Sequence, residues 1–142
     1  MLTLSPRRGR MRLYFQTYPD AYVDAELYAQ FLKSALWHIK TPLVVVHDGG
    51  TIHKGQTVHE LEQSCDRLHL HLLPPYAPEL NPVEYVWTYA KSHRLANHAP
   101  QDVSDIDRLV VRELEETDHD QHRLRSFFAS APLSWENTTL FI

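Results

Sequence analysis

The stretch that decides the fold runs from Leu68 to Glu84 and reads LHLHLLPPYAPELNPVE. Leucine and histidine alternate from Leu68 to Leu73, which is the period-2 pattern of a β-strand with one buried face. Pro74-Pro75 ends this strand, because proline has no N–H to donate to a neighbouring strand. Asn81-Pro82 then supplies a capping residue and a proline at the first helical position. The stretch therefore predicts a strand, a proline-rich loop and a helix that continues to Arg94.

A more apolar strand is predicted upstream, at Leu43 to Val46. Its sequence is Leu-Val-Val-Val, which suits a strand buried on both faces, and Gly49-Gly50 ends it. A helix from Asp24 to Trp37 precedes this strand, with Asp24 as its N-cap and Trp37 expected in the core. A weaker helix, Gln56 to Cys65, follows the strand.

The two ends of the chain complete the expected architecture. Residues 1–17 alternate apolar and polar side chains around a Pro/Gly turn, which predicts an antiparallel hairpin. Near the C-terminus we expect one helix that opens at Ser104-Asp105 and another from Gln121 to Ser130. This order of elements is that of an α/β fold, with parallel strands after an antiparallel start. We expect a single domain over residues 1–142.

The composition is that of an ordinary globular domain. Of the 142 residues, 43% are hydrophobic and 23% are charged. The longest purely apolar run, Leu43 to Val46, is far too short to cross a bilayer, so no membrane association is expected. The only cysteine, Cys65, excludes an internal disulfide and suits a reducing cytoplasm.

Two acids occupy positions where α/β proteins place their chemistry. Asp48 follows the Val-rich strand, and Glu84 lies just inside the helix after the next strand. Ligand sites of open α/β sheets lie at the carboxyl ends of parallel strands, so the two carboxylates are expected to meet there. Converging carboxylates suit Mg²⁺, a hard cation with oxygen ligands, and a pair of such ions supports phosphodiester chemistry.

Each acid also has a purely structural interpretation. Asp48 precedes Gly49-Gly50, so its side chain could simply shape a turn. Glu84 ends the segment Asn81-Pro82-Val83-Glu84, which has the form of a capping box in which Glu84 reaches back to the backbone of Asn81. The residues by themselves leave both interpretations open.

Three segments of the chain together indicate a family. They are His47-Asp48-Gly49, Ile52-His53-Lys54, and the block from Leu73 to Glu84 followed by Trp87. These segments resemble the catalytic core of mariner-like DDE transposases of bacterial insertion sequences. The short segments are weakly specific, whereas the long proline-rich block, at this distance from an aspartate that ends a Val-rich strand, is strongly specific.

The resemblance implies a fold, a reaction and a set of site residues. The fold is a ribonuclease H-like mixed sheet, here truncated to an antiparallel hairpin remnant plus two parallel strands, flanked by helices. Three acids of the family bind two Mg²⁺ (or Mn²⁺) ions for strand cleavage at transposon ends and strand transfer into target DNA. By position, Asp48 resembles the second acid and Glu84 the third. His53, Asn81 and Tyr76 are candidates for supporting roles, and the ring of Tyr76 could stack on a DNA base or pack within its loop.

The chain departs from the family pattern at its beginning. The first acid of the family lies on a strand before the segment that this chain begins with, and a helix-turn-helix DNA-binding region lies further upstream. Asp20 and Asp24 are misplaced for the role of the first acid. We therefore expect a partial catalytic domain that is poorly stable, joins its remaining strands directly, or pairs through them with a second copy or with the missing N-terminal part.

This departure leaves two functions open. The first is a strand-transferase domain that cleaves very weakly or not at all until the missing segment is supplied. The second is a non-catalytic remnant or a binding module that associates with an intact transposase or with DNA.

The charge distribution offers one candidate DNA-contacting patch. The net charge is −4, although a free-standing DNA-binding protein is usually basic. Arg7, Arg8, Arg10 and Arg12 are bunched near the start of the chain and are candidates for phosphate contacts, with a solvated hairpin tip as the alternative. The expected place of action is the bacterial cytoplasm, on nucleoid DNA.

The histidines offer a second metal hypothesis. His47, Asp48 and His53, together with His69 and His71, carry enough nitrogen and oxygen ligands for a zinc site. Against zinc, His69 and His71 alternate with leucines, which is the pattern of the exposed face of a strand.

Overall fold

The computed structural model describes residues 1–5 and 9–132. Its strands form two pairs. The first pair is an antiparallel hairpin of β1 (Leu2–Ser5) and β2 (Arg10–Leu13), and the second is a parallel pair of β3 (Leu43–His47) and β4 (Leu68–Leu72). The two pairs form separate sheets, with no ladder between them in this part of the chain.

Five α-helices surround the strands in the described ranges. In chain order they are α1 (Ala25–His38), α2 (Gln56–Ser64), α3 (Pro82–His93), α4 (Val103–His119) and α5 (Gln121–Ser130). Short 3-10 helices follow β3 (η1, Thr51–Lys54), precede α3 (η2, Pro78–Leu80) and follow α3 (η3, Leu95–Asn97). None of the described helices is long and apolar enough to cross a membrane.

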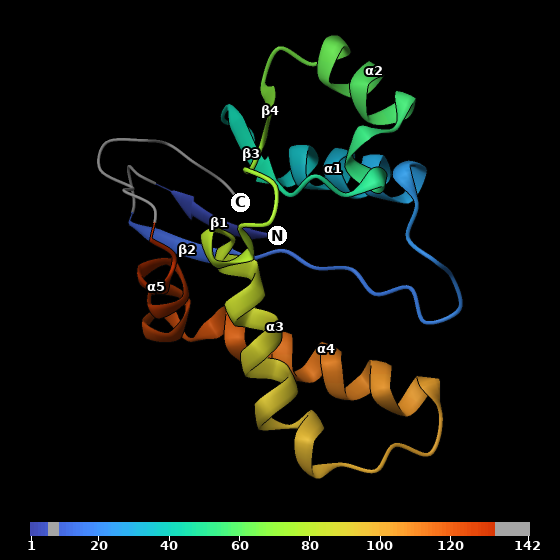
Figure 1. The fold of residues 1–142 in the computed structure, drawn as a ribbon, viewed down its shortest axis with the longest axis vertical. Coiled ribbons are helices and arrows are strands. Elements are labelled where there is room, and N and C mark those ends of the chain that lie inside the picture. The colour runs from blue at the N-terminus through green and yellow to red at the C-terminus, as the bar shows by residue number, and fades with distance from the viewer. Residues whose placement is uncertain (6–8, 133–142) are drawn as a thin grey trace.

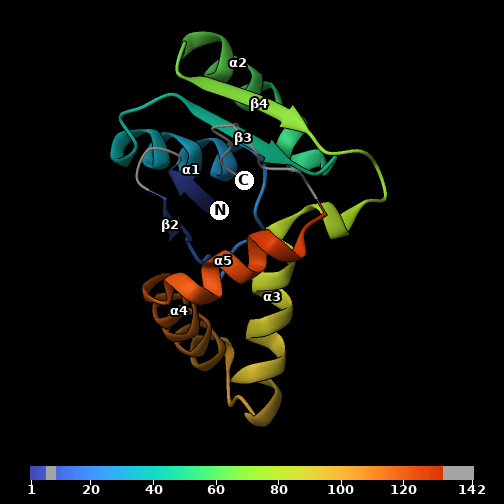
Figure 2. The ribbon, with the colours of Figure 1, turned by 90° about the vertical axis from the view of Figure 1, so that its left-hand side faces the viewer.

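The elements gather into two halves (Figures 1 and 2). The parallel pair lies with α1 and α2 in one half, and the hairpin lies with α3, α4 and α5 in the other. Each half has its own hydrophobic cluster. The cluster of the first half consists of Ala29, Leu32, Ala35, Leu36, Leu43, Val45, Val58, Leu61 and Leu68. The cluster of the second half consists of Leu2, Met11, Leu13, Val86, Leu114, Leu124, Phe127 and Phe128.

The expected elements are confirmed with small shifts at their ends. Asp24 caps α1 as expected, since its carboxylate accepts hydrogen bonds from the N–H groups of Glu26 and Leu27 at 3.0 and 2.9 Å. The expected place of Trp37 in the core is wrong, because Trp37 is 70% exposed. Lys40 lies over its ring at 5.1 Å, a cation–π contact that suits an exposed aromatic side chain.

Side chains from the helices cover the outer edge of each sheet. Gln121 accepts a hydrogen bond from the Met11 N–H at 3.0 Å and donates one to the Met11 carbonyl at 2.9 Å. Asp118 accepts one from the Leu13 N–H at 2.6 Å. On the other sheet, Glu62 accepts one from the Leu70 N–H at 2.7 Å. The edges of β2 and β4 are thus closed to further strands, which is one way in which proteins prevent edge-to-edge pairing.

Candidate active site

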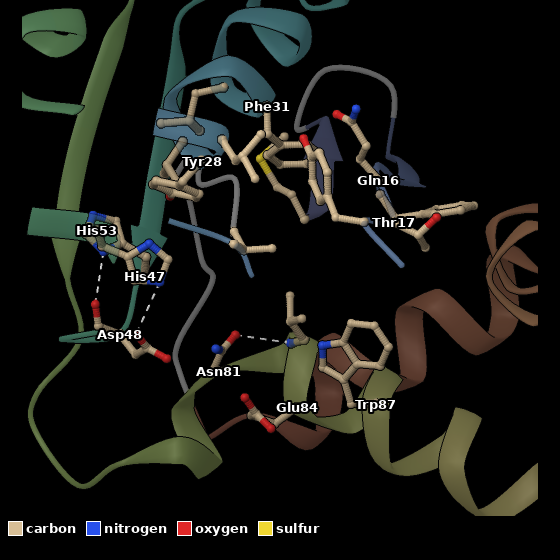
Figure 3. A pocket seen from close by; sticks show the side chains of 18 of the residues that line it. Gln16, Thr17, Tyr28, Phe31, His47, Asp48, His53, Asn81, Glu84 and Trp87 are labelled. Carbon is tan, nitrogen blue, oxygen red and sulfur yellow. Dashed lines mark hydrogen bonds and ion pairs between the residues drawn. The ribbon is translucent and has the colours of Figure 1, made fainter. Parts of the chain in front are cut away.

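Asp48 and Glu84 lie on the walls of the same cavities. A cavity of about 350 Å³ lies between the two halves of the molecule, and a smaller one of about 200 Å³ lies under the proline-rich loop. Asp48 and Glu84 line each of these cavities. Asp48 is the first residue after β3, and Glu84 is in the first turn of α3. The expectation that the two acids meet at one end of the parallel strands is therefore consistent with the fold, and Figure 3 shows them with Asn81 on one side of the larger cavity.

Asp48 is held through one of its carboxylate oxygens. Its side chain is 59% exposed, and Oδ1 accepts a hydrogen bond from the N–H of Gly50 at 2.8 Å. The same oxygen lies 3.2 Å from Nε2 of His53. The contact with Gly50 has the form of the expected turn, so the turn and an exposed carboxylate coexist at this position.

His53 lies beside the rings of His47 and Tyr28, above Asp48 in the view of Figure 3. Its ring is 4.4 Å from that of Tyr28 in an edge-on arrangement and 4.7 Å from that of His47. Burial and the neighbouring His47 lower the pKa of His53, against an opposing effect of the Asp48 carboxylate. Burial, reinforced by that carboxylate, raises the pKa of Tyr28. Burial therefore favours the neutral forms of His53 and Tyr28.

The sequence did not indicate that Tyr28 lies in this cluster, and it indicated Gly50 only as part of the turn that ends the strand. Tyr28 belongs to α1 and reaches the site because α1 packs against η1 and shares a hydrophobic cluster with β3. Gly50 has no side chain to indicate a role. A Cβ atom at Gly50 would lie 2.9 Å from Oδ1 of Asp48, closer than real Cβ contacts. Its spacing of two residues after an aspartate is the one local signal for the turn.

The capping-box prediction for Glu84 is wrong in its second half. Asn81 does cap α3, since its side-chain oxygen accepts from the Val83 N–H at 3.2 Å. However, the N–H of Asn81 donates to the carbonyl of Pro78 at 2.9 Å, so Glu84 has no cap donor to reach. The exposed Glu84 carboxylate has no hydrogen bond or ion pair among the described residues.

Tyr76 stands at the tip of the proline-rich loop. Its side chain is fully exposed, which excludes the packing role, and its φ of 60° lies in the left-handed region that non-glycine residues rarely adopt. The loop wraps the smaller cavity between Asp48 and Glu84. An exposed ring is thus held beside the two acids at a cost in backbone energy.

The arginine candidates divide into three cases. Arg10 is exposed, and its side chain has no partner among the described residues. Arg12 is half exposed and forms a bidentate pair with Asp118, with Nε 3.0 and 3.1 Å from the two carboxylate oxygens. Arg7 and Arg8 lie outside the described residues. Arg12 is therefore committed to a partner within the fold, whereas Arg10 is available.

The described residues contain no cluster of three or more His, Cys, Asp or Glu side chains that could hold a metal ion. His69 and His71 are exposed on β4, as their alternation with leucine predicts. They do not join His47 and His53, so the zinc hypothesis receives no support. The oxygen donors in place are those of Asp48 and Glu84, which are of the kind that Mg²⁺ and Mn²⁺ prefer.

Comparison with known families settles the relationship of the chain. A family described as DDE superfamily endonuclease matches residues 4–107, which is most of the sequence. The chain belongs to the DDE superfamily of endonucleases. The match includes the segments around Asp48 and Glu84 that indicated the family.

The solved structures of one transposase share the fold of this DDE domain. The catalytic domain of Mos1 mariner transposase has a TM-score of 0.51 and 18% sequence identity over 89% of this chain and 71% of that one. Structures of that domain with raltegravir and either Mg or Mn give the same TM-score of 0.51. The Mos1 strand transfer complex has a TM-score of 0.50 and 20% identity, over 89% of this chain and 41% of that one. These similarities confirm the ribonuclease H-like fold.

A curated relative is similar over a shorter stretch. The uncharacterized protein y4pE/y4sA of Sinorhizobium fredii is 46% identical over 41 residues, which is 29% of this chain. The match spans only 30% of that protein's length. The activity of the complete relative is therefore a matter for a proposal.

Proposed function

We propose that this DDE domain provides two of the metal-binding acids for DNA strand cleavage and strand transfer at the ends of an insertion sequence. Asp48 and Glu84 are the two acids, and Mg²⁺ (or Mn²⁺) is the cation. The observation that carries the proposal is the position of both exposed carboxylates on the same cavities, with Glu84 free of any partner among the described residues.

The donors fit such a cation in kind. Oδ2 of Asp48 and both oxygens of Glu84 are uncommitted within the described ranges, and carboxylate oxygens are the ligands of a hard divalent ion. When bound, paired ions of this type activate an attacking oxygen and stabilise the leaving oxygen of a phosphodiester. The chain's own part is to hold the two carboxylates in place on rigid elements, Asp48 at the end of β3 and Glu84 in the first turn of α3.

We further propose that a strand from outside these 142 residues completes the site with a third carboxylate. Successive residues of a β-strand direct their N–H groups to opposite edges, and the direction of these groups on β3 supports the proposed strand. The N–H of Leu43 points toward β4, so those of Val44 and Val46 point away from it, and Val46 lines the larger cavity. On the other side, the hairpin-facing wall of this cavity includes Met1 and Phe15. Among the described residues, Gln121 and Glu62 cover the outer edges of β2 and β4, so the inner edges of β1 and β3 are the ones that a further strand would join.

The amino group of Met1 lies beside the larger cavity. It is buried and donates to the carbonyl of Tyr14 at 2.5 Å. Burial lowers the pKa of this amino group to about 5, because the charged form loses its hydration. The strand proposed above would lie in the larger cavity, whose wall includes Met1. The segment could come in cis, or in trans from a second polypeptide, including a second copy.

DNA is the proposed partner, both as insertion-sequence end and as target. Arg10, with Arg7 and Arg8, would contact phosphates, and the exposed ring of Tyr76 would stack on a base next to the acids. We place this activity in the bacterial cytoplasm, where the single cysteine would stay reduced.

The test compares the chain by itself with the chain joined to its upstream coding sequence. Both are incubated with supercoiled plasmid that carries the insertion sequence and its flanks, with Mg²⁺ or Mn²⁺, and nicked and linear products are quantified. We expect products only from the joined polypeptide, and Asp48→Asn or Glu84→Gln should abolish them. Products that persist in both variants would overturn the proposal. Binding without cleavage by either protein would instead establish the non-catalytic binding module.

A further inference from the structure

We infer that His53 is a positioning residue that fixes Asp48 so that a single oxygen, Oδ2, faces a bound cation. The inference rests on the proposed role of Asp48 as a metal ligand. It adds the residue that orients this ligand and the number of oxygens that the ligand offers.

The contacts of Asp48 are the first step of the argument. The Gly50 N–H and the His53 Nε2 both approach Oδ1, at 2.8 and 3.2 Å, and Oδ2 has no partner among the described residues. A carboxylate that is 59% exposed would otherwise rotate freely in water. Two contacts to the same oxygen fix the rotation of the side chain and leave the other oxygen free.

The surroundings of His53 determine which of its nitrogens carries the proton. Nδ1 is buried and has no hydrogen-bond partner in the described part of the chain, and the side chain as a whole is 14% exposed. A proton on Nδ1 would be a buried donor without an acceptor, which costs more than a bare lone pair. The neutral tautomer with its proton on Nε2 avoids that cost and donates to Asp48. His53 therefore acts as a hydrogen-bond donor of fixed direction.

Packing fixes the ring itself. The edge of Tyr28 contacts the His53 ring at a centroid distance of 4.4 Å, and His47 lies on another side at 4.7 Å. His47 is only 8% exposed, and its Nδ1 is within 3.0 Å of the Asp48 carbonyl. The imidazole is thus held by rings that belong to α1 and β3. Outer contacts of this kind orient metal ligands in other proteins, and their loss typically weakens metal binding by about tenfold or more.

The experiment measures Mn²⁺ binding rather than cleavage. Substoichiometric Mn²⁺ is titrated into the ¹⁵N-labelled chain, and paramagnetic broadening of the Gly49 and Gly50 amide signals gives an apparent affinity. The chain has 4 glycines, so these signals are readily assigned. Gly9, in the hairpin turn, serves as the remote reference within the same spectrum.

Three variants of His53 separate hydrogen bonding from packing. His53→Ala should weaken Mn²⁺ binding about tenfold. His53→Phe keeps a ring against Tyr28 but no donor, and should weaken binding as much as alanine. His53→Gln places an amide N–H near the position of Nε2 and should retain most of the affinity. The exposed His59→Ala, on α2, is the matched control and should bind as the wild type does.

Two results would overturn the positioning role. One is wild-type affinity in His53→Phe, which would mean that ring packing suffices. The other is an equal loss in His53→Gln and His53→Ala, when both keep dispersed spectra. Asp48→Asn tests the proposed function separately. If this variant keeps the wild-type broadening, the metal-ligand assignment itself fails, whereas loss in Asp48→Asn with no effect of any His53 variant refutes only the positioning role.

Discussion

Replacing Asp118 by alanine should reopen the outer edge of β2. Asp118 lies near the C-terminal end of α4 and is 9% exposed. Its Oδ1 accepts a hydrogen bond from the N–H of Leu13 at 2.6 Å. Both of its carboxylate oxygens accept from Nε of Arg12. An alanine would leave a buried backbone donor and a cation without their partner.

The cost can be worked out from these contacts. An unsatisfied buried N–H costs about 1–3 kcal/mol. The pair with Arg12 adds at most about 1 kcal/mol, because the arginine side chain is half exposed and water screens the pair. We therefore expect the free energy of unfolding to fall by about 3 kcal/mol in Asp118→Ala. This is a large part of the roughly 5–15 kcal/mol that stabilises an ordinary domain.

Urea unfolding, followed by tryptophan fluorescence, measures the change. Glu115→Ala is the matched control, because Glu115 is exposed on the same helix and should change the free energy by no more than about 0.5 kcal/mol. Asp118→Asn keeps an acceptor for the Leu13 N–H and should lose less than Asp118→Ala. A loss below about 1 kcal/mol in Asp118→Ala would refute the reasoning, since the edge would then not depend on this carboxylate.

Three other perturbations have outcomes that the structure fixes. Gly50→Ala places a methyl group 2.9 Å from Oδ1 of Asp48; it should weaken Mn²⁺ binding about tenfold in the same titration, and unchanged affinity would contradict the close approach. Asparagine tolerates the φ of 60° at position 76 better than tyrosine does, so Tyr76→Asn should raise the free energy of unfolding by up to about 1 kcal/mol. The same variant lacks the aromatic ring and should bind labelled single-stranded DNA more weakly. Tighter DNA binding would exclude stacking. Hydrogen bonding from the Arg123 N–H lowers the pKa of Asp120 below its ordinary 3.8. The ionised Asp120 therefore stabilises the fold above pH 3.8, and this stabilisation is lost as the pH falls through the lower pKa of the folded state. Acid unfolding of Asp120→Asn should therefore be less steep there than that of the wild type, and parallel curves would show that the cap has no such linkage.

Local signals explain how much of the fold could be predicted. The N-cap Asp24 begins α1 as predicted, and the predicted bounds of α5 are those observed. Each of these signals acts within a few residues of its effect, so a single sequence contains it. The positions of Asp48 and Glu84 followed from the same kind of signal, an acid after a strand and an acid after a capped helix start.

The contacts that complete the site and the sheet edges could not be predicted in this way. Asp118 and Gln121 look like ordinary surface residues at a helix junction, yet they serve a strand more than a hundred positions away in sequence. Tyr28 reaches His53 only through the packing of α1. The exposure of Trp37 depends likewise on which face of α1 the sheet covers. All of these depend on tertiary placement, for which the local pattern has no signal.

The proline-rich block explains how Glu84 becomes free to act. Pro78 to Leu80 form a 3-10 helix that ends at Asn81, and the N–H of Asn81 donates to Pro78 within it. Asn81 then begins α3, where its side chain accepts from Val83 and its carbonyl accepts from the N–H of Glu84. Pro82 has no N–H to satisfy. The N–H groups of Asn81, Val83 and Glu84 are therefore paired without the Glu84 carboxylate, which a capping box would have used. The helix start that the sequence predicts thus forms without the side chain of Glu84, and this carboxylate remains available to a ligand.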